Sequence, residues 1–182
     1  MDDNVLVQAI AKGDKKALHI LYERHHKFIL HLAFRYLANE EDARDIVQDV
    51  FIELFRFARH YEEKGQLSTW LYRVTVNRCI NHKKSAYYRL REHDIKDAIF
   101  ENLATKDEEL AEQKMMTIER QKLLLEALHK LPKQQRMAMI LSRFNELSYR
   151  EIAQSMNISE SSVTSLLFRA RKNLKKIILS LS

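Results

Sequence analysis

Apolar residues recur every three or four positions over most of the chain, and this spacing predicts amphipathic helices. Two groups near the N-terminus, from Leu6 to Tyr22 and from Phe28 to Tyr36, predict two helices. Asn39 is suited to cap a third, because Glu40–Asp42 would then place acids in its positively polarised first turn. The stripe that follows predicts a well-buried helix through Ala43, Ile46, Val47, Val50, Phe51, Leu54, Phe55 and Ala58.

The next helix follows a break in the pattern around Gly65, and Ser68 can cap it. Trp70 lies on its apolar side, so we interpret this side chain as part of the core rather than as a base-stacking group. The opposite face of the helix is polar and carries Arg73, Asn77, Asn81 and Lys84.

Residues 85–114 mix charges with few apolar anchors, which is typical of a flexible or partly helical linker. Periodicity returns at Ile118 and stops at Pro132, which can open the following helix at its first position. The chain has only two glycines and one proline, and it therefore has few of the residues that tight β-hairpin turns require. The sequence therefore predicts an all-α fold of two small helical domains, residues 1–90 and 115–182, joined by a flexible linker over residues 91–114.

The formal net charge of +6 is concentrated in two stretches. Basic residues occur without acids from Arg73 to Arg91 and again from Thr164 to the C-terminus, whereas Glu92–Glu112 is rich in acids. Two basic faces separated by an acidic spacer favour a polyanion bound at two places. The alternative is that both faces are simply solvated.

Other features limit the class of protein. The single cysteine, Cys79, excludes an internal disulfide, and no apolar run approaches the ~20 residues that span a bilayer. The first residues carry charges where a signal peptide needs an apolar core, so we expect a cytoplasmic protein without membrane insertion. The histidines form no catalytic motif, and we expect no enzymatic activity, no cofactor and no metal. Zinc bound by His25, His26 and Cys79 is disfavoured, because adjacent helical histidines point about 100° apart and a fourth ligand is lacking.

The C-terminal part carries the signals of a helix-turn-helix. Ser148 and Glu151 have the spacing of a capping box, Asn157 can adopt the left-handed turn conformation, and Ser159 can cap the second helix. The alternative is an ordinary helical hairpin. In a helix-turn-helix the second helix lies in the major groove, where hydroxyls, an aromatic ring and arginines contact bases and phosphates. The residues predicted to do so are Ser161, Thr164, Ser165, Phe168, Arg169 and Arg171.

Three segments then complete a recognisable order: D-I-V-Q-D-V-F at Asp45–Phe51, S-T-W-L-Y-R-V at Ser68–Val74 followed by Asn77, and Leu131–Pro132 followed by the helix-turn-helix. Over nearly the whole chain this order resembles the extracytoplasmic-function (ECF) group of sigma-70-family RNA polymerase sigma factors. The resemblance implies an N-terminal sigma-two domain that opens the minus-ten element and a C-terminal sigma-four domain that binds the minus-thirty-five element. It also implies three partners: core RNA polymerase, through its β′ clamp helices and β flap, promoter DNA, and an anti-sigma factor.

The resemblance further implies site residues. In the family, an unpaired base of the minus-ten element enters a pocket on the sigma-two domain, and the loop from Tyr61 to Leu67 selects its sequence. Thr164 and Leu166 stand where many relatives have arginine, so we expect weaker phosphate contact or an unusual minus-thirty-five element. The polymerase-binding residues implied are Asp45, Gln48, Asp49 and Glu53. The minus-ten residues implied are Tyr61, Arg73, Asn77, Asn81, Lys83 and Lys84.

Two other classes of protein remain as alternatives. A stand-alone helix-turn-helix regulator would bind duplex DNA unaided and usually as a dimer, but neither the Asp45–Phe51 helix nor the Asn77 face serves dimerisation. A helical adaptor without a nucleic-acid role would leave both basic stretches unused. A salt-sensitive affinity for DNA would exclude the adaptor.

Overall fold

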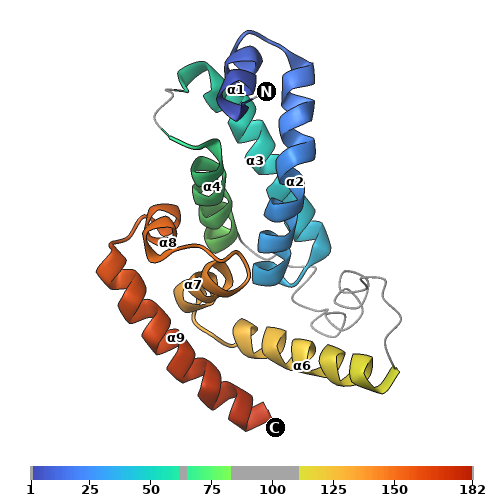
Figure 1. The fold of residues 1–182 in the computed structure, drawn as a ribbon, viewed down its shortest axis with the longest axis vertical. Helices are drawn as coiled ribbons and strands as arrows, with labels where there is room; N and C mark the ends of the chain where they lie inside the picture. The colour runs from blue at the N-terminus through green and yellow to red at the C-terminus, as the bar shows by residue number, and fades with distance from the viewer. Residues whose placement is uncertain (1, 62–64, 83–110, 182) are drawn as a thin grey trace.

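The computed structural model describes residues 2–61, 65–82 and 111–181, with side chains described from residue 119 onward in the last range. Regular structure in these ranges is helical, which confirms the predicted all-α fold (Figure 1). The N-terminal unit consists of α1 (Asp3–Ala11), α2 (Lys15–Leu37), α3 (Glu40–Phe57), the short 3-10 helix η1 (Ala58–His60) and α4 (Leu67–Asn81). The C-terminal unit consists of α6 (Ala111–His129), α7 (Lys133–Arg143), α8 (Tyr149–Met156) and α9 (Glu160–Leu181).

The first helix break differs from the predicted one. We expected it between Tyr22 and Phe28, but α2 runs without interruption through that segment, and the chain turns at Gly13, whose φ is 93°. Glycine adopts this positive φ without a Cβ clash. Asp14 then caps α2 by accepting hydrogen bonds from the amides of Lys16 (2.8 Å) and Ala17 (3.2 Å).

Helix α3 begins as predicted and departs from the prediction near its end. Asn39 Oδ1 accepts a 2.8 Å hydrogen bond from the Asp42 amide, and the predicted stripe is buried except at Phe55, which is 44% exposed. The predicted cap of α4 is also wrong, because Gln66 occupies the N-cap and Ser68 lies inside the helix.

The helix-turn-helix prediction is confirmed in detail. Ser148 Oγ accepts from the Glu151 amide, and Glu151 Oε2 accepts from the Ser148 amide at 2.7 Å, so both halves of the capping box form. Asn157 has a φ of 55° at the turn, and Ser159 Oγ accepts from the Ser162 amide at 3.1 Å. Pro132 is one position from its expected place, since it precedes α7 as the N-cap.

The domain boundary is only partly visible. Helix α6 begins at Ala111, inside the predicted linker of residues 91–114, and the preceding linker residues lie outside the described ranges.

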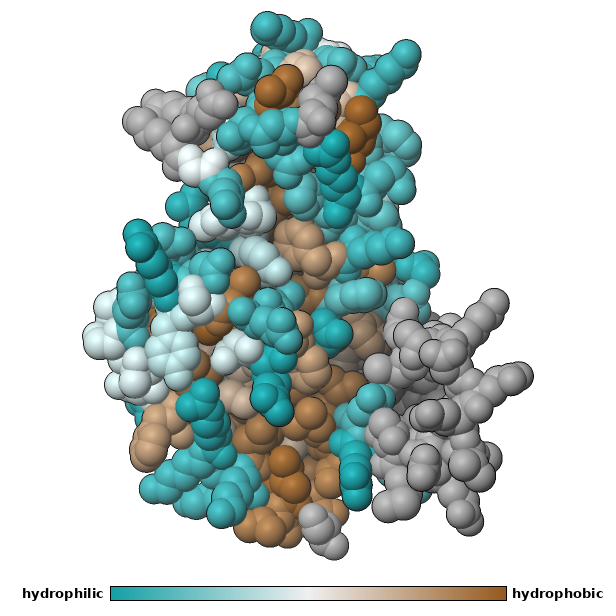
Figure 2. Space-filling view, in the orientation of Figure 1, coloured by the Kyte–Doolittle hydropathy of each residue, from teal (hydrophilic) through white to brown (hydrophobic). Residues whose placement is uncertain are grey.

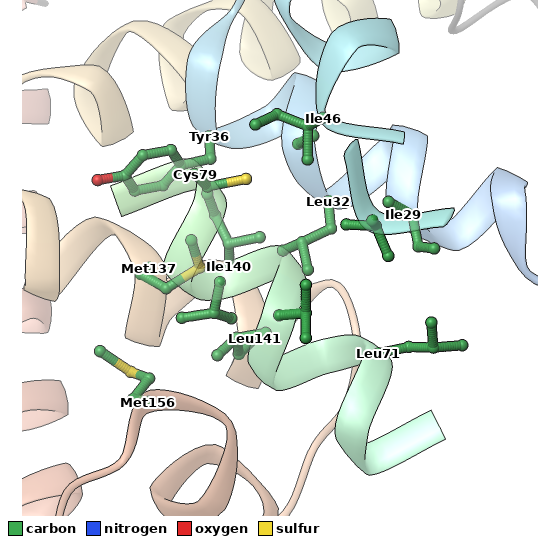
Figure 3. Packing of buried hydrophobic residues seen from close by; sticks show 14 of the residues in the cluster. Ile29, Leu32, Tyr36, Ile46, Leu71, Cys79, Met137, Ile140, Leu141 and Met156 are labelled. Carbon is green, nitrogen blue, oxygen red and sulfur yellow. The ribbon is translucent and has the colours of Figure 1, made fainter. Parts of the chain in front are cut away.

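The two units share one hydrophobic core. Helix α8 packs against α4, and α7 packs against α2 and α4 (Figure 1). Close to this junction, buried side chains of the N-terminal unit face those of the C-terminal unit (Figure 3). The labelled residues of the first unit include Leu32, Tyr36, Leu71 and Cys79, and those of the second are Met137, Ile140, Leu141 and Met156.

Arg136 of α7 holds the two units together by polar contacts. Its Nη1 donates to the Tyr36 carbonyl (3.2 Å) at the end of α2, while Nε donates to the Leu128 carbonyl (3.1 Å) near the end of α6. The guanidinium also lies 5.3 Å from the centroid of the Tyr36 ring. A cation is favourable there because the carbonyl ends of both helices carry partial negative charge.

Most of the face shown in Figure 2 is hydrophilic, and apolar surface gathers between α6 and the C-terminal end of α9. Leu179 is among the exposed apolar residues of that end. Within the described ranges, no helix is both long enough and apolar enough to cross a bilayer.

Candidate functional site

A groove of about 590 Å³ lies between α3 and α4 and is lined by polar side chains from both helices. Helix α4 contributes Arg73, Asn77 and Asn81. Their four-residue spacing places them on one helix face, which is exposed as predicted. The structure therefore brings together three of the six residues predicted for the minus-ten element, while Lys83 and Lys84 lie outside the described residues.

The opposite wall of this groove carries acids from α3. Arg78 of α4 reaches across, and its Nε (3.1 Å) and Nη2 (2.7 Å) both donate to Glu53 Oε2. Its Nη1 lies 3.9 Å from Asp49 Oδ2. The hydrogen bond to Glu53 raises the pKa of Arg78 above its ordinary value, so this side chain remains a cation.

Tyr61 lies in a second pocket, of about 610 Å³, at the junction of the two units. Its hydroxyl donates a 2.5 Å hydrogen bond to Asn4 Oδ1 of α1. Trp70 of the same pocket stacks on Phe57, with ring centroids 4.8 Å apart and an interplanar angle of 12°. This half-buried tryptophan is packed against the core, as predicted, and it also lines both pockets.

The second pocket has one wall from the helix-turn-helix. Gln154 and Asn157 line it opposite Gln66, Thr69 and the aromatic rings. Arg73 lines both this pocket and the α3–α4 groove, so the two sites adjoin each other at this residue.

Helix α9 presents the predicted recognition surface to solvent. Val163, Leu167 and Ala170 are buried, and this fixes which face of α9 points outward. Phe168 is 68% exposed, which is unusual for a phenylalanine and leaves its ring available for contact. All six residues predicted for the minus-thirty-five element are exposed: Ser161, Thr164, Ser165, Phe168, Arg169 and Arg171.

The residues predicted to face polymerase divide between two sides of α3. Asp49 and Glu53 line the groove toward α4, whereas Gln48 lines an apolar groove of about 810 Å³ between α2 and α3. Asp45 is exposed on the same helix.

The sequence did not predict the apolar groove, because the spacing of Phe55 assigned it to the buried stripe of α3. Ile52 is 41% exposed and also lines this groove. An apolar residue at this position, on the otherwise polar face of the predicted helix, was the signal that could have revealed it.

The disfavoured zinc ligands do not come together. Cys79 is buried, and burial raises the pKa of its thiol to about 12. His25 Nε2 lies 2.7 Å from Asp3 Oδ2, which gives this ring a structural partner. In the part of the chain that the structure describes, no three His, Cys, Asp or Glu side chains are grouped as metal ligands.

Solved structures with a similar arrangement of helices include CnrH in complex with the cytosolic domain of CnrY, with a TM-score of 0.70 and 22% identity over 99% of both chains. They also include the sigma factor RpoE in complex with the anti-sigma factor NepR from Bartonella quintana, with a TM-score of 0.59 and 19% identity. That match covers 90% of this chain and 97% of the other. These similarities concern the fold.

Similarity in sequence extends over nearly the whole chain. Residues 21–87 match the family model of sigma-70 region 2, and residues 121–174 match that of sigma-70, region 4. The ECF RNA polymerase sigma-E factor of Haemophilus influenzae is 31% identical, covering 98% of this chain and 96% of that protein. The RNA polymerase sigma-H factor of Pseudomonas aeruginosa is 32% identical, covering 97% of this chain and 93% of that protein. The ECF RNA polymerase sigma-E factor of Escherichia coli is also 32% identical, covering 94% of this chain and 92% of that protein. The chain therefore belongs to the sigma-70 family of RNA polymerase sigma factors, within its ECF group.

Proposed function

We propose that this protein binds core RNA polymerase in the cytoplasm and directs it to specific promoters, without catalytic chemistry or a cofactor of its own. Residues 1–90 would bind polymerase and the minus-ten element, residues 91–114 would serve as the linker, and residues 115–182 would bind the minus-thirty-five element. The observation that carries the proposal is that one chain of this family exposes two separate surfaces suited to DNA. These are the polar face of α4 and the outer face of α9.

The outer face of α9 has the chemistry to read duplex DNA. Arg169 and Arg171 can bind guanine edges or phosphates, and Phe168 can contact a thymine methyl group. Ser161, Thr164 and Ser165 offer hydroxyls that serve as both donors and acceptors.

The face of α4 suits a single strand. Asn77 has both a donor and an acceptor for a base edge, and Tyr61 has a ring on which a base can stack. These contacts offset the few kcal/mol that removing a base from the duplex costs. Arg73, Asn81, Lys83 and Lys84 would bind the phosphates of the same strand.

Asp45, Gln48, Asp49 and Glu53 remain our candidates for contact with the β′ clamp helices. Their carboxylates and amide suit a basic partner helix. Ile52 and Phe55 add an exposed apolar surface beside Gln48, and desolvation of such a surface supplies affinity that charges alone do not.

Promoter binding requires the two units to separate. Elements centred at minus-ten and minus-thirty-five lie ~25 base pairs apart, or ~85 Å at ~3.4 Å per base pair. A compact chain of 182 residues has a radius of gyration of only roughly 16 Å. The 20 residues from 91 to 110, between the proposed sigma-two domain and α6, can reach at most ~70 Å when fully extended, and the two units themselves span the rest of the distance. The open form is thus the one that binds polymerase and promoter together.

An anti-sigma factor is the proposed regulator. Because Gln154 and Asn157 already line the pocket of Tyr61, a protein that stabilises this closed arrangement would keep the helix-turn-helix beside the Tyr61 part of the minus-ten site and the two units together. It would act by differential affinity for the closed form.

Run-off transcription on a genomic promoter pool, with core polymerase and with or without the protein, tests the proposed function. New transcripts that depend on the protein support it and reveal the promoter sequence. A protein that binds duplex DNA unaided but yields no transcripts would instead be a stand-alone regulator.

A further inference from the structure

The groove between α3 and α4 contains acids beside its proposed strand-binding residues. Asp49 and Glu53 line the same space as Arg73, Asn77 and Asn81. A DNA strand on Asn77 would therefore bring its phosphates toward two carboxylates, and like charges at such separations repel.

Arg78 lines the same groove and pairs with both acids. Two of its donors are engaged by a single carboxylate oxygen of Glu53, and a third nitrogen approaches Asp49. The guanidinium N–H groups that could bind a phosphate are thus already directed at carboxylates. Its side chain is nevertheless 44% exposed, so its charge contributes to the potential in the groove.

We propose that Arg78 is a positioning residue for minus-ten binding: it neutralises Asp49 and Glu53 and so allows the single strand to reach Asn77, without itself being a phosphate ligand. This inference rests on the proposed function. With Arg78 present, the two carboxylates in the groove are balanced by Arg73 and Arg78, beside His82. Without Arg78 the groove has an excess negative charge on the path of the strand.

The same geometry gives Glu53 a second role. One oxygen of its carboxylate is engaged by Arg78, so Glu53 takes part in this internal charge pair beside the polymerase contact proposed above.

The test uses full-length protein assembled with core polymerase and purified as the holoenzyme. The probe is a promoter fragment recovered from the transcription experiment and mispaired across its minus-ten element, so that melting does not contribute to the affinity. Arg78→Ala should weaken binding of this probe about fivefold to tenfold at low salt. The effect should shrink as salt is raised, because screening reduces the repulsion.

The decisive variant combines Arg78→Ala with Glu53→Gln. This pair leaves the net charge of the groove unchanged and should restore the affinity of the probe to within about twofold of wild type. Arg44→Ala is the matched control, since Arg44 also pairs with a glutamate, Glu40, but lies outside this groove. It should leave probe affinity unchanged.

Three results would overturn the inference. Failure of Glu53→Gln to rescue Arg78→Ala would identify Arg78 as a direct phosphate ligand. If Glu53→Gln alone lowered the affinity for the probe as much as Arg78→Ala does, and independently of salt, the Arg78–Glu53 pair would be a structural link between α3 and α4. Unchanged binding of Arg78→Ala would show that Arg78 has no role. If wild-type holoenzyme did not bind the probe, the proposed function itself would fail, which is a distinguishable outcome.

Discussion

Replacing Arg35 by methionine and Tyr72 by phenylalanine removes two contacts between the units while preserving the packing around them. The Arg35 guanidinium lies 4.8 Å from the centroid of the Phe144 ring, and Asn145 Nδ2 donates a 3.3 Å hydrogen bond to the Tyr72 hydroxyl. Methionine keeps the unbranched stem of Arg35. Phenylalanine keeps the ring of Tyr72, whose centroid is 4.8 Å from that of Phe28.

The magnitude follows from the two contacts. A half-buried cation–π pair contributes about 1 kcal/mol, and a neutral hydrogen bond contributes about 1 kcal/mol. Asn145 Oδ1 is already buried without a hydrogen-bond partner in the described structure, so losing the Tyr72 contact leaves this amide still less satisfied. The double variant should destabilise the closed arrangement by about 2 kcal/mol, which raises the ratio of open to closed forms roughly 30-fold.

Fluorescence energy transfer between dyes at Glu41→Cys in the N-terminal unit and Lys172→Cys in the C-terminal unit reports the ratio of open to closed forms. Cys79 is buried and should stay unlabelled. Transfer efficiency should fall in the double variant, or, if the closed form still predominates, the apparent Kd for core polymerase should fall by up to about 30-fold. Arg59→Met with Tyr149→Phe, at two exposed positions, is the matched control. Unchanged transfer and unchanged polymerase affinity in a folded double variant would refute the proposed opening.

Three further predictions test separate parts of the molecule. Asn77→Ala should lower the rate of promoter opening at least about tenfold with little effect on polymerase affinity, because Asn77 would bind the extruded base. Asp49→Ala should instead weaken polymerase binding, and equal losses of polymerase affinity in the two variants would contradict this division of roles. Phe168→Ala should weaken duplex binding of the minus-thirty-five element by about 1 kcal/mol in fluorescence anisotropy, with no change in Tm, and a lowered Tm would mean that the ring is structural. Ser148→Ala should lower the free energy of unfolding by about 1 kcal/mol in urea titrations. The Ser148 hydroxyl also donates to the Glu151 carboxylate at 2.7 Å, and hydrogen bonds from Ser148 lower the pKa of Glu151 below its ordinary 4.5. The part of the cost that comes from this bond should be full above pH 4.5 and should disappear as pH falls through the lowered value, whereas the part that comes from the bond to the Glu151 amide should remain. A pH-independent cost would contradict the capping-box explanation.

The helix-turn-helix could be predicted from the sequence because its signals are local. The capping box needs only Ser148 and Glu151, and the turn needs a residue such as Asn157 that tolerates positive φ. Burial of Val163 and Ala170 then follows from helical periodicity, and it determines which side of α9 faces solvent.

Features that depend on distant parts of the chain could not be predicted. Phe55 has the spacing of a core residue, but no element of the described structure covers it fully, so it borders a groove instead. Arg136 contacts the Tyr36 carbonyl 100 positions away, and nothing in the local sequence distinguishes it from a solvated arginine. Arg78 and Glu53 likewise meet only because α3 and α4 are adjacent in the fold.

The proposed function makes this protein a subunit of RNA polymerase. Gel filtration of the purified protein with core polymerase, followed by binding of the eluted complex to promoter fragments, distinguishes such a subunit from a protein that binds DNA alone. We predict stable co-elution, promoter binding by the complex, and only weak, salt-sensitive DNA binding by the protein alone. Absence of co-elution together with specific duplex binding by the protein alone would show that it is a stand-alone DNA-binding protein and not a polymerase subunit.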